Sequence, residues 1–168
     1  MNRFMIVVNP DKDTDSTVTN RIQSYLEAHG AACMVRDVFH LEFSDWEALQ
    51  KEQFDCVLVL GGDGTLLRMA GETEDIDIPL FGINLGTVGF LTEGEVANIE
   101  EILDRLLTDD FTIEERMMVT GTVTKEDGTT YRKSALNDIV ISRAGFSRLI
   151  GLNVSVDGQV LDTYEADG

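Results

Sequence analysis

The stretch that decides the fold is Cys56-Val57-Leu58-Val59-Leu60-Gly61-Gly62-Asp63-Gly64-Thr65. Its five leading apolar residues predict a buried strand, and the segment 66–70 that follows predicts the first turns of a helix. Three glycines between a strand and a helix let the backbone approach a bulky ligand, and the N–H groups of such a turn bind phosphate oxygens. Since passive anion binding needs no carboxylate, Asp63 is expected to hold a metal ion or to accept a proton. The stretch therefore indicates phosphoryl transfer.

The composition is that of a globular protein with a strongly acidic charge. The 168 residues are enough for one sizeable core, or for one domain and part of another. No apolar run approaches the length of a membrane span, and the N-terminal residues lack the pattern of a signal peptide, so we expect a cytoplasmic protein without membrane contact. The formal charge of −18 argues against nucleic acid as a partner, because phosphate backbones are bound by basic patches.

The acidic charge also limits how a phosphate ligand can be bound. The positive potential would have to come from backbone N–H groups, a few nearby arginines and a divalent cation such as Mg²⁺. We therefore expect most of the acidic residues to form a solvated surface away from the glycine stretch.

Residues 1–110 alternate between strand patterns and helix patterns. Strands are expected at residues 4–8, 32–35, 56–60 and 79–84, and helices at residues 18–26, 44–52, 66–70 and 99–107. This alternation favours a mostly parallel sheet with helices on both faces, and we predict a Rossmann-like α/β domain over residues 1–110. Cys33 and Cys56 fall in predicted strands and form no Cys-x-x-Cys pair, so reduced thiols in the core are expected.

The pattern changes near residue 111, where helical spacing ends. Two later pairs, Asp127-Gly128 and Asp157-Gly158, are typical of hairpin turns, and apolar residues alternate with smaller or polar ones over residues 150–156. We therefore predict that residues 111–168 begin an all-β, sandwich-like domain. Because the expected sheet stays unclosed at Gly168, we also expect the chain to be a fragment of a longer protein.

Other glycine-rich motifs follow the first one in a definite order. Gly-Gly-Asp-Gly alone occurs in phosphofructokinases, in diacylglycerol- and sphingosine-type lipid kinases and in NAD kinases. Gly82-Ile83-Asn84-Leu85-Gly86-Thr87-Val88-Gly89-Phe90-Leu91-Thr92 resembles the second signature of NAD kinases, a glycine turn that faces the first. Residues 111–118 resemble the family's entry into its β domain, Ala135-Leu136-Asn137-Asp138-Ile139-Val140-Ile141 its third signature, and residues 164–168 the start of a fourth. The chain thus resembles the N-terminal portion of a bacterial-type NAD kinase.

The resemblance implies a reaction and a catalytic residue. NAD kinases transfer the γ-phosphoryl group of ATP, or in some members a phosphoryl group of inorganic polyphosphate, to the 2′-hydroxyl of the adenosine ribose of NAD, and NADP is formed. Asp63 would be the general base, with metal contact as a second role. Gly61, Gly62, Gly64 and Thr65 would bind phosphates while Mg²⁺ offsets their charge. The alternative for the glycines is a plain tight turn that needs positive φ.

The resemblance also implies contacts to the nucleotides, each with a structural alternative. Arg68 would reach a phosphate from near the helix start, or it would belong to a solvated helix face. Asn84 would bind nucleotide, or it would only cap its own turn. Asn137 and Asp138 would hydrogen-bond adenine or ribose from an apolar strand context, or they would form a turn at a strand end.

Two further contacts are implied near the C-terminal end of the chain. Arg148 matches a position that contacts the dinucleotide, and its alternative is a surface arginine. Asp167 resembles the aspartate that contacts the nicotinamide-bearing half. Among the departures from the family pattern, Asp138 stands where many members carry Glu, and Glu165 stands at a position that is often basic.

Two other functions remain open at this point. A lipid kinase would share the opening Val8-Asn9-Pro10 and the glycine stretch, but that class usually continues with an Asn-Glu-containing helix segment, where this chain has Leu66-Leu67-Arg68-Met69. The other alternative is a nucleotide-binding module without catalysis, because a fragment would lack half of the substrate site. We therefore expect the 168-residue chain alone to be weakly active or inactive, and the full-length protein to be a NAD kinase. The resemblance also implies homodimers or tetramers built through the β domain.

Overall fold

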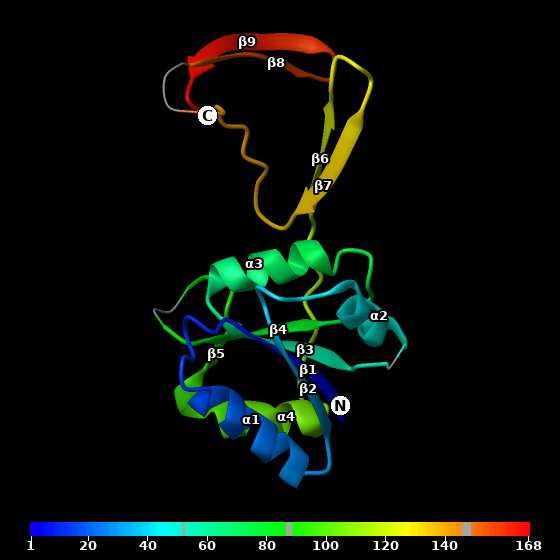
Figure 1. The fold of residues 1–168 in the computed structure, drawn as a ribbon, viewed down its shortest axis with the longest axis vertical. Coiled ribbons are helices and arrows are strands. Elements are labelled where there is room, and N and C mark those ends of the chain that lie inside the picture. The colour runs from blue at the N-terminus through cyan, green and yellow to red at the C-terminus, as the bar shows by residue number, and fades with distance from the viewer. Residues whose placement is uncertain (52, 87–88, 146–148) are drawn as a thin grey trace.

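The fold is built on a parallel sheet at the centre of its first two thirds (Figure 1). The structure, a computed structural model, describes residues 1–51, 53–86, 89–145 and 149–168. Among these residues, five strands pair in the order β2-β1-β3-β4-β5, all parallel. Their bounds are Arg3–Val8 for β1, Ala32–Asp37 for β2, Cys56–Gly61 for β3, Leu80–Asn84 for β4 and Gly94–Glu95 for β5.

Helices cover both faces of this sheet, as the alternating pattern predicts. Helices α1 (Thr17–Ala28) and α4 (Ile99–Leu107) lie on one face, and α2 (Phe43–Lys51) and α3 (Asp63–Glu72) lie on the other (Figure 1). A short 3₁₀ helix, η1 (Val96–Asn98), leads into α4. The prediction of a Rossmann-like α/β arrangement is confirmed.

Strand β3 shows why the sheet needs both layers of helices. All six of its residues are buried. Cys56, Leu58 and Leu60 belong to the apolar cluster with α1 and α4, and Val57 and Val59 belong to the cluster with α2 and α3. Because successive side chains of a strand point to opposite faces, a continuous apolar run fits a strand that is covered on both sides.

The strand order has a topological switch point between β1 and β3. The chain passes from β1 to β2 in one direction and from β2 to β3 in the other, so the order reverses between these two neighbouring strands. Doubly wound sheets of this order bind ligands outside the carboxyl ends of the strands at such a switch point. Here these ends are Val8 and Gly61, and the glycine stretch begins at the second of them.

Residues 119–135 and 150–166 form two antiparallel hairpins, which Figure 1 shows on the side of the sheet that α3 covers. Strand β6 (Val119–Thr124) pairs with β7 (Thr130–Ala135), and β8 (Ile150–Val156) pairs with β9 (Gln159–Ala166). Gly128 and Gly158 have φ of 83° and 79°, a conformation that glycine adopts without strain, so both Asp-Gly pairs form the predicted turns. The fold class is confirmed, whereas the domain boundary at residues 110–111 stays a prediction.

One local expectation is wrong. The apolar residues after Ala135 predict a strand that carries Asn137 and Asp138, but β7 ends at Ala135 and residues 136–142 have no strand conformation. Ile139, Val140 and Ile141 are 42%, 73% and 63% exposed, so of these three only Ile139, which lies against Gly121, is more than half covered. Asn137 lies in a bend and Asp138 in irregular backbone beyond the end of β7, and their contact with adenine or ribose stays a prediction.

Both cysteines lie in strands as predicted, and neither forms a disulfide. Cys56 is buried in β3, and this burial raises the pKa of its thiol to about 12. Cys33 in β2 is half-buried, and desolvation raises the pKa of its thiol to about 11. Both thiols are therefore protonated and unreactive at neutral pH. In a search of the described residues, no helix was long and apolar enough to cross a membrane.

We expect Leu58→Ala to lower the free energy of unfolding by about 2–5 kcal/mol, because the truncation leaves a cavity in the centre of β3 where Leu58 is fully buried. Leu161→Ala in β9 is the matched control, since Leu161 is 65% exposed and should change stability by less than about 0.5 kcal/mol. Urea unfolding of the wild type and both variants checks this. Equal losses in the two variants would contradict the assignment of the core.

Candidate functional site

Three turns meet at the carboxyl edge of the parallel sheet. The turn after β1 is held to β3 by the N–H of Asn9, which donates to the carbonyl of Leu60 at 2.8 Å. The turn after β4 is held to β3 by the N–H of Leu85, which donates to the carbonyl of Gly61 at 2.8 Å. The sheet therefore brings these turns together at the glycine stretch.

The glycines of the first turn have two different reasons to lack a side chain. A β-carbon on Gly61 would lie 2.3 Å from the hydroxyl oxygen of Thr65, which is buried beneath the turn, so Gly61 is required by packing. Around Gly62 and Gly64 nothing lies within 4 Å of an added β-carbon. These two positions leave open space at the start of α3, where a ligand can approach the backbone.

The alternative of a plain turn with positive φ is wrong for these glycines. In the described part of the chain, the glycines with positive φ are Gly30, Gly128, Gly145 and Gly158. Gly62 has φ −140° and ψ −170°, an extended conformation that any residue adopts. As the residue before the first turn of α3, it offers no side chain to cap the amides there, and such amides are the groups that bind anions.

Asp63 joins the first glycine turn to the second. Its Oδ2 accepts the N–H of Phe90 at 2.8 Å, and its Oδ1 accepts the N–H groups of Leu91 and Thr92 at 3.1 and 3.2 Å. A β-carbon on Gly89 would stand 2.2 Å from Oδ1, so only glycine allows this approach. The expected facing of the two glycine turns is therefore seen directly.

These hydrogen bonds determine the charge of Asp63. The N–H of Phe90, together with those of Leu91 and Thr92, outweighs desolvation and holds the pKa of the carboxyl below its ordinary value of 3.8. Asp63 is also the first residue of α3, where the helix dipole favours a negative charge. The carboxylate is therefore ionised at neutral pH.

Asn84 ends β4 and is buried with 6% of its surface exposed. Its Oδ1 accepts the N–H of Gly86 at 2.8 Å, so the expected cap of its own turn is present. Its place opposite Gly61 in the pairing of β3 and β4 puts it at the same edge as the first glycine turn. A contact between Asn84 and nucleotide stays a prediction.

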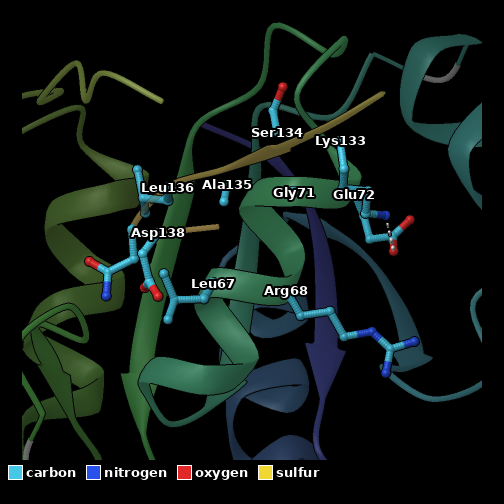
Figure 2. A pocket seen from close by; sticks show the side chains of 10 residues that line it. Leu67, Arg68, Gly71, Glu72, Lys133, Ser134, Ala135, Leu136 and Asp138 are labelled. Carbon is cyan, nitrogen blue, oxygen red and sulfur yellow. Dashed lines mark ion pairs between the residues drawn. The ribbon is translucent and has the colours of Figure 1, made fainter. Parts of the chain in front are cut away.

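A cavity of 220 Å³ brings three of the other predicted residues together. One wall is the face of α3 with Arg68, and the opposite wall is the segment 133–138 with Asn137 and Asp138 (Figure 2). The ion pair between Lys133 and Glu72, 4.0 Å long, closes one end. Helix α3 thus begins at the glycine turn and continues along this cavity.

Arg68 does not lie at the glycine turn in this arrangement. Its guanidinium carbon is 5.8 Å from the centre of the Phe39 ring, and Figure 2 shows the side chain directed away from Asp138. Asp167 lines neither the cavity nor the turns, and its backbone carbonyl accepts the N–H of Arg143 at 3.0 Å. Arg148 lies outside the described residues.

Phe90 is a residue that the motifs alone do not single out. Its side chain is fully exposed, although its backbone N–H is held by Asp63. An exposed aromatic ring is a surface on which a flat ligand can stack. The signal in the sequence is its place in the second glycine turn, directly after Gly89.

The described residues provide few ligands for a cation. They contain no group of three or more His, Cys, Asp or Glu side chains that could hold a metal ion. Mg²⁺ commonly binds through one or two carboxylates together with substrate phosphates rather than in a cage of protein ligands. Asp63, as one carboxylate beside open phosphate-binding amides, fits that mode of binding.

The fold and the site define the class of protein. It is a doubly wound α/β protein that carries facing glycine turns, with a carboxylate between them, at the carboxyl edge of its sheet, and the first of these turns borders the switch point. Residues 4–111 match the family described as ATP-NAD kinase N-terminal domain. The chain therefore belongs to the NAD kinase family.

Individual relatives agree with this assignment. The NAD kinase of Lachnoclostridium phytofermentans is 40% identical over 172 residues, which cover 100% of this chain and 60% of the relative. The NAD kinase of Agathobacter rectalis is 41% identical over 173 residues, which cover 100% of this chain and 59% of the relative. The chain thus spans about 60% of the length of these relatives.

A solved structure supports the fold. The crystal structure of yeast NADH kinase complexed with NADH matches with a TM-score of 0.78 at 19% identity, over 99% of this chain and 56% of the other. At this identity the match speaks for the fold alone, including the antiparallel part that follows the parallel sheet.

We expect Asp63→Asn to be less stable than the wild type at neutral pH, because the ionised carboxylate is hydrogen-bonded in the folded protein and solvated in the unfolded one. A lowered native pKa gives stability that is fully present above 3.8 and is lost as the pH falls through the native value. The difference in free energy of unfolding between the wild type and Asp63→Asn should therefore become smaller as the pH falls below 3.8. Urea unfolding across this pH range measures it, with Asp75→Asn on an exposed carboxylate as the control. A difference in free energy of unfolding that grows as the pH falls would contradict this account.

Substitutions of two glycines should separate packing from ligand space. We expect Gly61→Ala to destabilise the protein, because the added methyl meets Thr65. Gly64→Ala should leave the free energy of unfolding unchanged or raise it by up to about 1 kcal/mol, since alanine favours the helix. Gly64→Ala should nevertheless weaken the binding of inorganic tripolyphosphate, a probe for a phosphate site, in calorimetry. Unchanged binding of this probe by Gly64→Ala would show that the open space at this glycine is not used.

Proposed function

We propose that the protein is a NAD kinase, which transfers the γ-phosphoryl group of ATP, or a phosphoryl group of inorganic polyphosphate, to the 2′-hydroxyl of the adenosine ribose of NAD. The observation that carries this proposal is the ionised Asp63 held between two facing glycine turns at the carboxyl edge of the sheet. Family membership selects NAD as the acceptor, because glycine turns alone are shared by several kinase classes.

Asp63 is the general base in this proposal, and its two oxygens have different parts. In the described structure, Oδ1 accepts three hydrogen bonds, from the N–H groups of Leu91 and Thr92 and from the Thr92 hydroxyl, whereas Oδ2 accepts the one from Phe90. Each carboxylate oxygen has two lone pairs, so Oδ2 keeps one for the ribose hydroxyl. The proton passes to Oδ2 as the hydroxyl oxygen bonds to phosphorus, while Oδ1 keeps the carboxylate in place.

The phosphates of the donor would lie over the open glycines. Gly62 and Gly64 leave the amides at the start of α3 accessible, and Thr65 lies directly beneath this turn. Mg²⁺ bound together with the donor phosphates would offset their negative charge, and Asp63 is the described carboxylate beside this space. In this arrangement the backbone amides and Mg²⁺ would supply the positive potential for phosphate binding in a chain with a formal charge of −18.

The acceptor dinucleotide would use the exposed groups around the turns. Phe90 is suited to stack on a flat base, and the cavity beside α3 offers the polar side chains of Asn137 and Asp138 for hydrogen bonds. Arg68 on the cavity wall would pair with a phosphate after its side chain moves from Phe39. Arg148 and Asp167 would contact the dinucleotide by their match to the family pattern.

We further infer a homo-oligomer, a dimer or tetramer, that works in the cytoplasm and binds neither nucleic acid nor membrane. Large apolar side chains are exposed in the antiparallel part, which supports burial of this surface against another part of an assembly. The acidic charge supports the exclusion of nucleic acid.

We expect the full-length protein to form NADP from NAD and ATP with Mg²⁺, and Asp63→Asn to lower kcat by about 100-fold or more, because the amide cannot accept the hydroxyl proton. The matched control, Asp75→Asn, should keep the wild-type rate. NADP formation is followed with a coupled dehydrogenase.

Two outcomes would contradict the proposal. Phosphorylation of diacylglycerol or sphingosine but not of NAD in the same assay would favour the lipid kinase alternative. Nucleotide binding without any phosphoryl transfer by the full-length protein would favour the non-catalytic module. An unchanged rate in Asp63→Asn would overturn the role of that residue alone.

A further inference from the structure

Lys12 lies beside the second glycine turn, far from it in sequence. It belongs to the turn after β1, and its side chain is exposed. A β-carbon placed on Gly86 would stand 3.9 Å from the ammonium nitrogen of Lys12. Gly86 follows Leu85, whose N–H is bonded to the carbonyl of Gly61. The ammonium group therefore lies at the carboxyl edge of the sheet, where the turns after β1, β3 and β4 meet.

The turn that carries Lys12 is held in place on both sides. Before it, Asn9 donates its N–H to Leu60, and the carbonyl of Asn9 accepts the N–H of Lys12 at 3.0 Å. After it, the buried carboxylate of Asp13 accepts the N–H groups of Val18 and Thr19 at 3.1 and 2.8 Å. The position of Lys12 is thus fixed by β3 on one side and by the start of α1 on the other.

The Lys12 ammonium has no carboxylate partner among the described residues. Most of the arginines and lysines with a described partner contact carboxylates, as Lys51 does with Glu47 and Lys133 with Glu72. Among the described residues, no hydrogen bond or ion pair involves the ammonium of Lys12. Lys125 and Arg132 also have no ion pair with a carboxylate in the described structure, so what distinguishes Lys12 is its place beside Gly86 in the second glycine turn. Its charge is available to a ligand.

We propose that Lys12 binds the linked phosphates of the phosphoryl donor as they lie across the glycine turns. This proposal rests on the proposed function, because it concerns the same donor site. It assigns to Lys12 the phosphate contact that the family resemblance implies for Arg68. A lysine ammonium is a compact charge that attracts phosphate oxygens and offsets negative charge during phosphoryl transfer. The Asn9 side chain, which donates to the Thr65 hydroxyl, and the open amides around Gly62 and Gly64 lie at the same edge of the sheet. These groups are uncharged, so they leave the positive charge of Lys12 in place.

The test compares Lys12→Met with Lys12→Arg in the full-length protein. The control is Lys125→Met, an exposed lysine in the β6–β7 hairpin. Calorimetry with Mg²⁺ measures the binding of inorganic tripolyphosphate and of ATP. We expect Lys12→Met to weaken both by about tenfold or more, as for the loss of a hydrogen bond to a charged group. Lys12→Arg should retain most of the binding, and the urea midpoints of both variants should equal that of the wild type.

Kinetics with NAD as the acceptor provide a second measurement. We expect Lys12→Met to raise the KM for the donor and to leave the KM for NAD unchanged. Weakened binding of ATP with unchanged binding of tripolyphosphate would overturn the proposal, because the contact would then be to the adenosine half. Unchanged binding of both donors would also overturn it.

The outcomes separate this proposal from the proposed function. If the full-length protein forms NADP and Lys12→Met binds ATP and tripolyphosphate as tightly as the wild type, the proposed function is supported and the proposed role of Lys12 is wrong. If no NADP is formed but tripolyphosphate binds in a Lys12-dependent way, the phosphate site stands and the NAD kinase proposal fails.

Discussion

The burial of β3 on both faces is the constraint from which the candidate site follows. Because its six residues are covered by two layers of helices, the strand cannot shift in register without exposing apolar side chains or burying polar ones. Its last residue, Gly61, is therefore fixed at the edge of the sheet. The neighbouring turns are then bonded to this end, through Asn9 on one side and Leu85 on the other. The buried strand β3 thus determines the position of the backbone amides that can bind a ligand.

Asp63 must satisfy two demands that oppose each other. The amides that hold it against the second glycine turn lower its pKa, which keeps it ionised but makes it a weaker base. The two carboxylate oxygens accept different numbers of hydrogen bonds, and this difference reconciles the two demands. Oδ1 carries most of the hydrogen bonds and fixes the orientation, while Oδ2 keeps capacity for a substrate proton. Alignment then contributes more to the proposed reaction than basicity does, as is usual for phosphoryl transfer.

Much of the fold could be predicted from the sequence because its signals are local. The apolar run of β3 and the Asp-Gly pairs of the two hairpins depend on neighbouring residues, and the structure contains each of them. The run after Ala135 shows the limit of such signals. Its residues are as apolar as those of a strand, but a strand forms only where a neighbouring strand supplies backbone hydrogen bonds, and residues 139–141 pair with no strand among the described residues. Val140 and Ile141 are also mostly exposed.

The candidate site was less predictable because its contacts join residues far apart in the chain. The motifs identify Asp63 and the turn after β4, yet the hydrogen bonds between them span 27–29 residues and follow from the pairing of β3 with β4. Arg68 shows the opposite case, since its sequence position suggests a phosphate contact while its side chain lies over Phe39. No spacing rule connects Lys12 to Gly86, because only the strand order places the ends of β1 and β4 on the same edge.

The electrostatics of the site follow from the same strand order. A chain with a charge of −18 repels phosphates over most of its surface, so a bound phosphate chain must be met by groups that are locally positive. Open amides at Gly62 and Gly64 supply fixed dipoles, and these glycines have no other structural reason to lack side chains. Lys12 adds a full charge that no carboxylate in the described structure neutralises. The acidic surface then helps selectivity, because an anion is stabilised only where the strand ends bring these groups together.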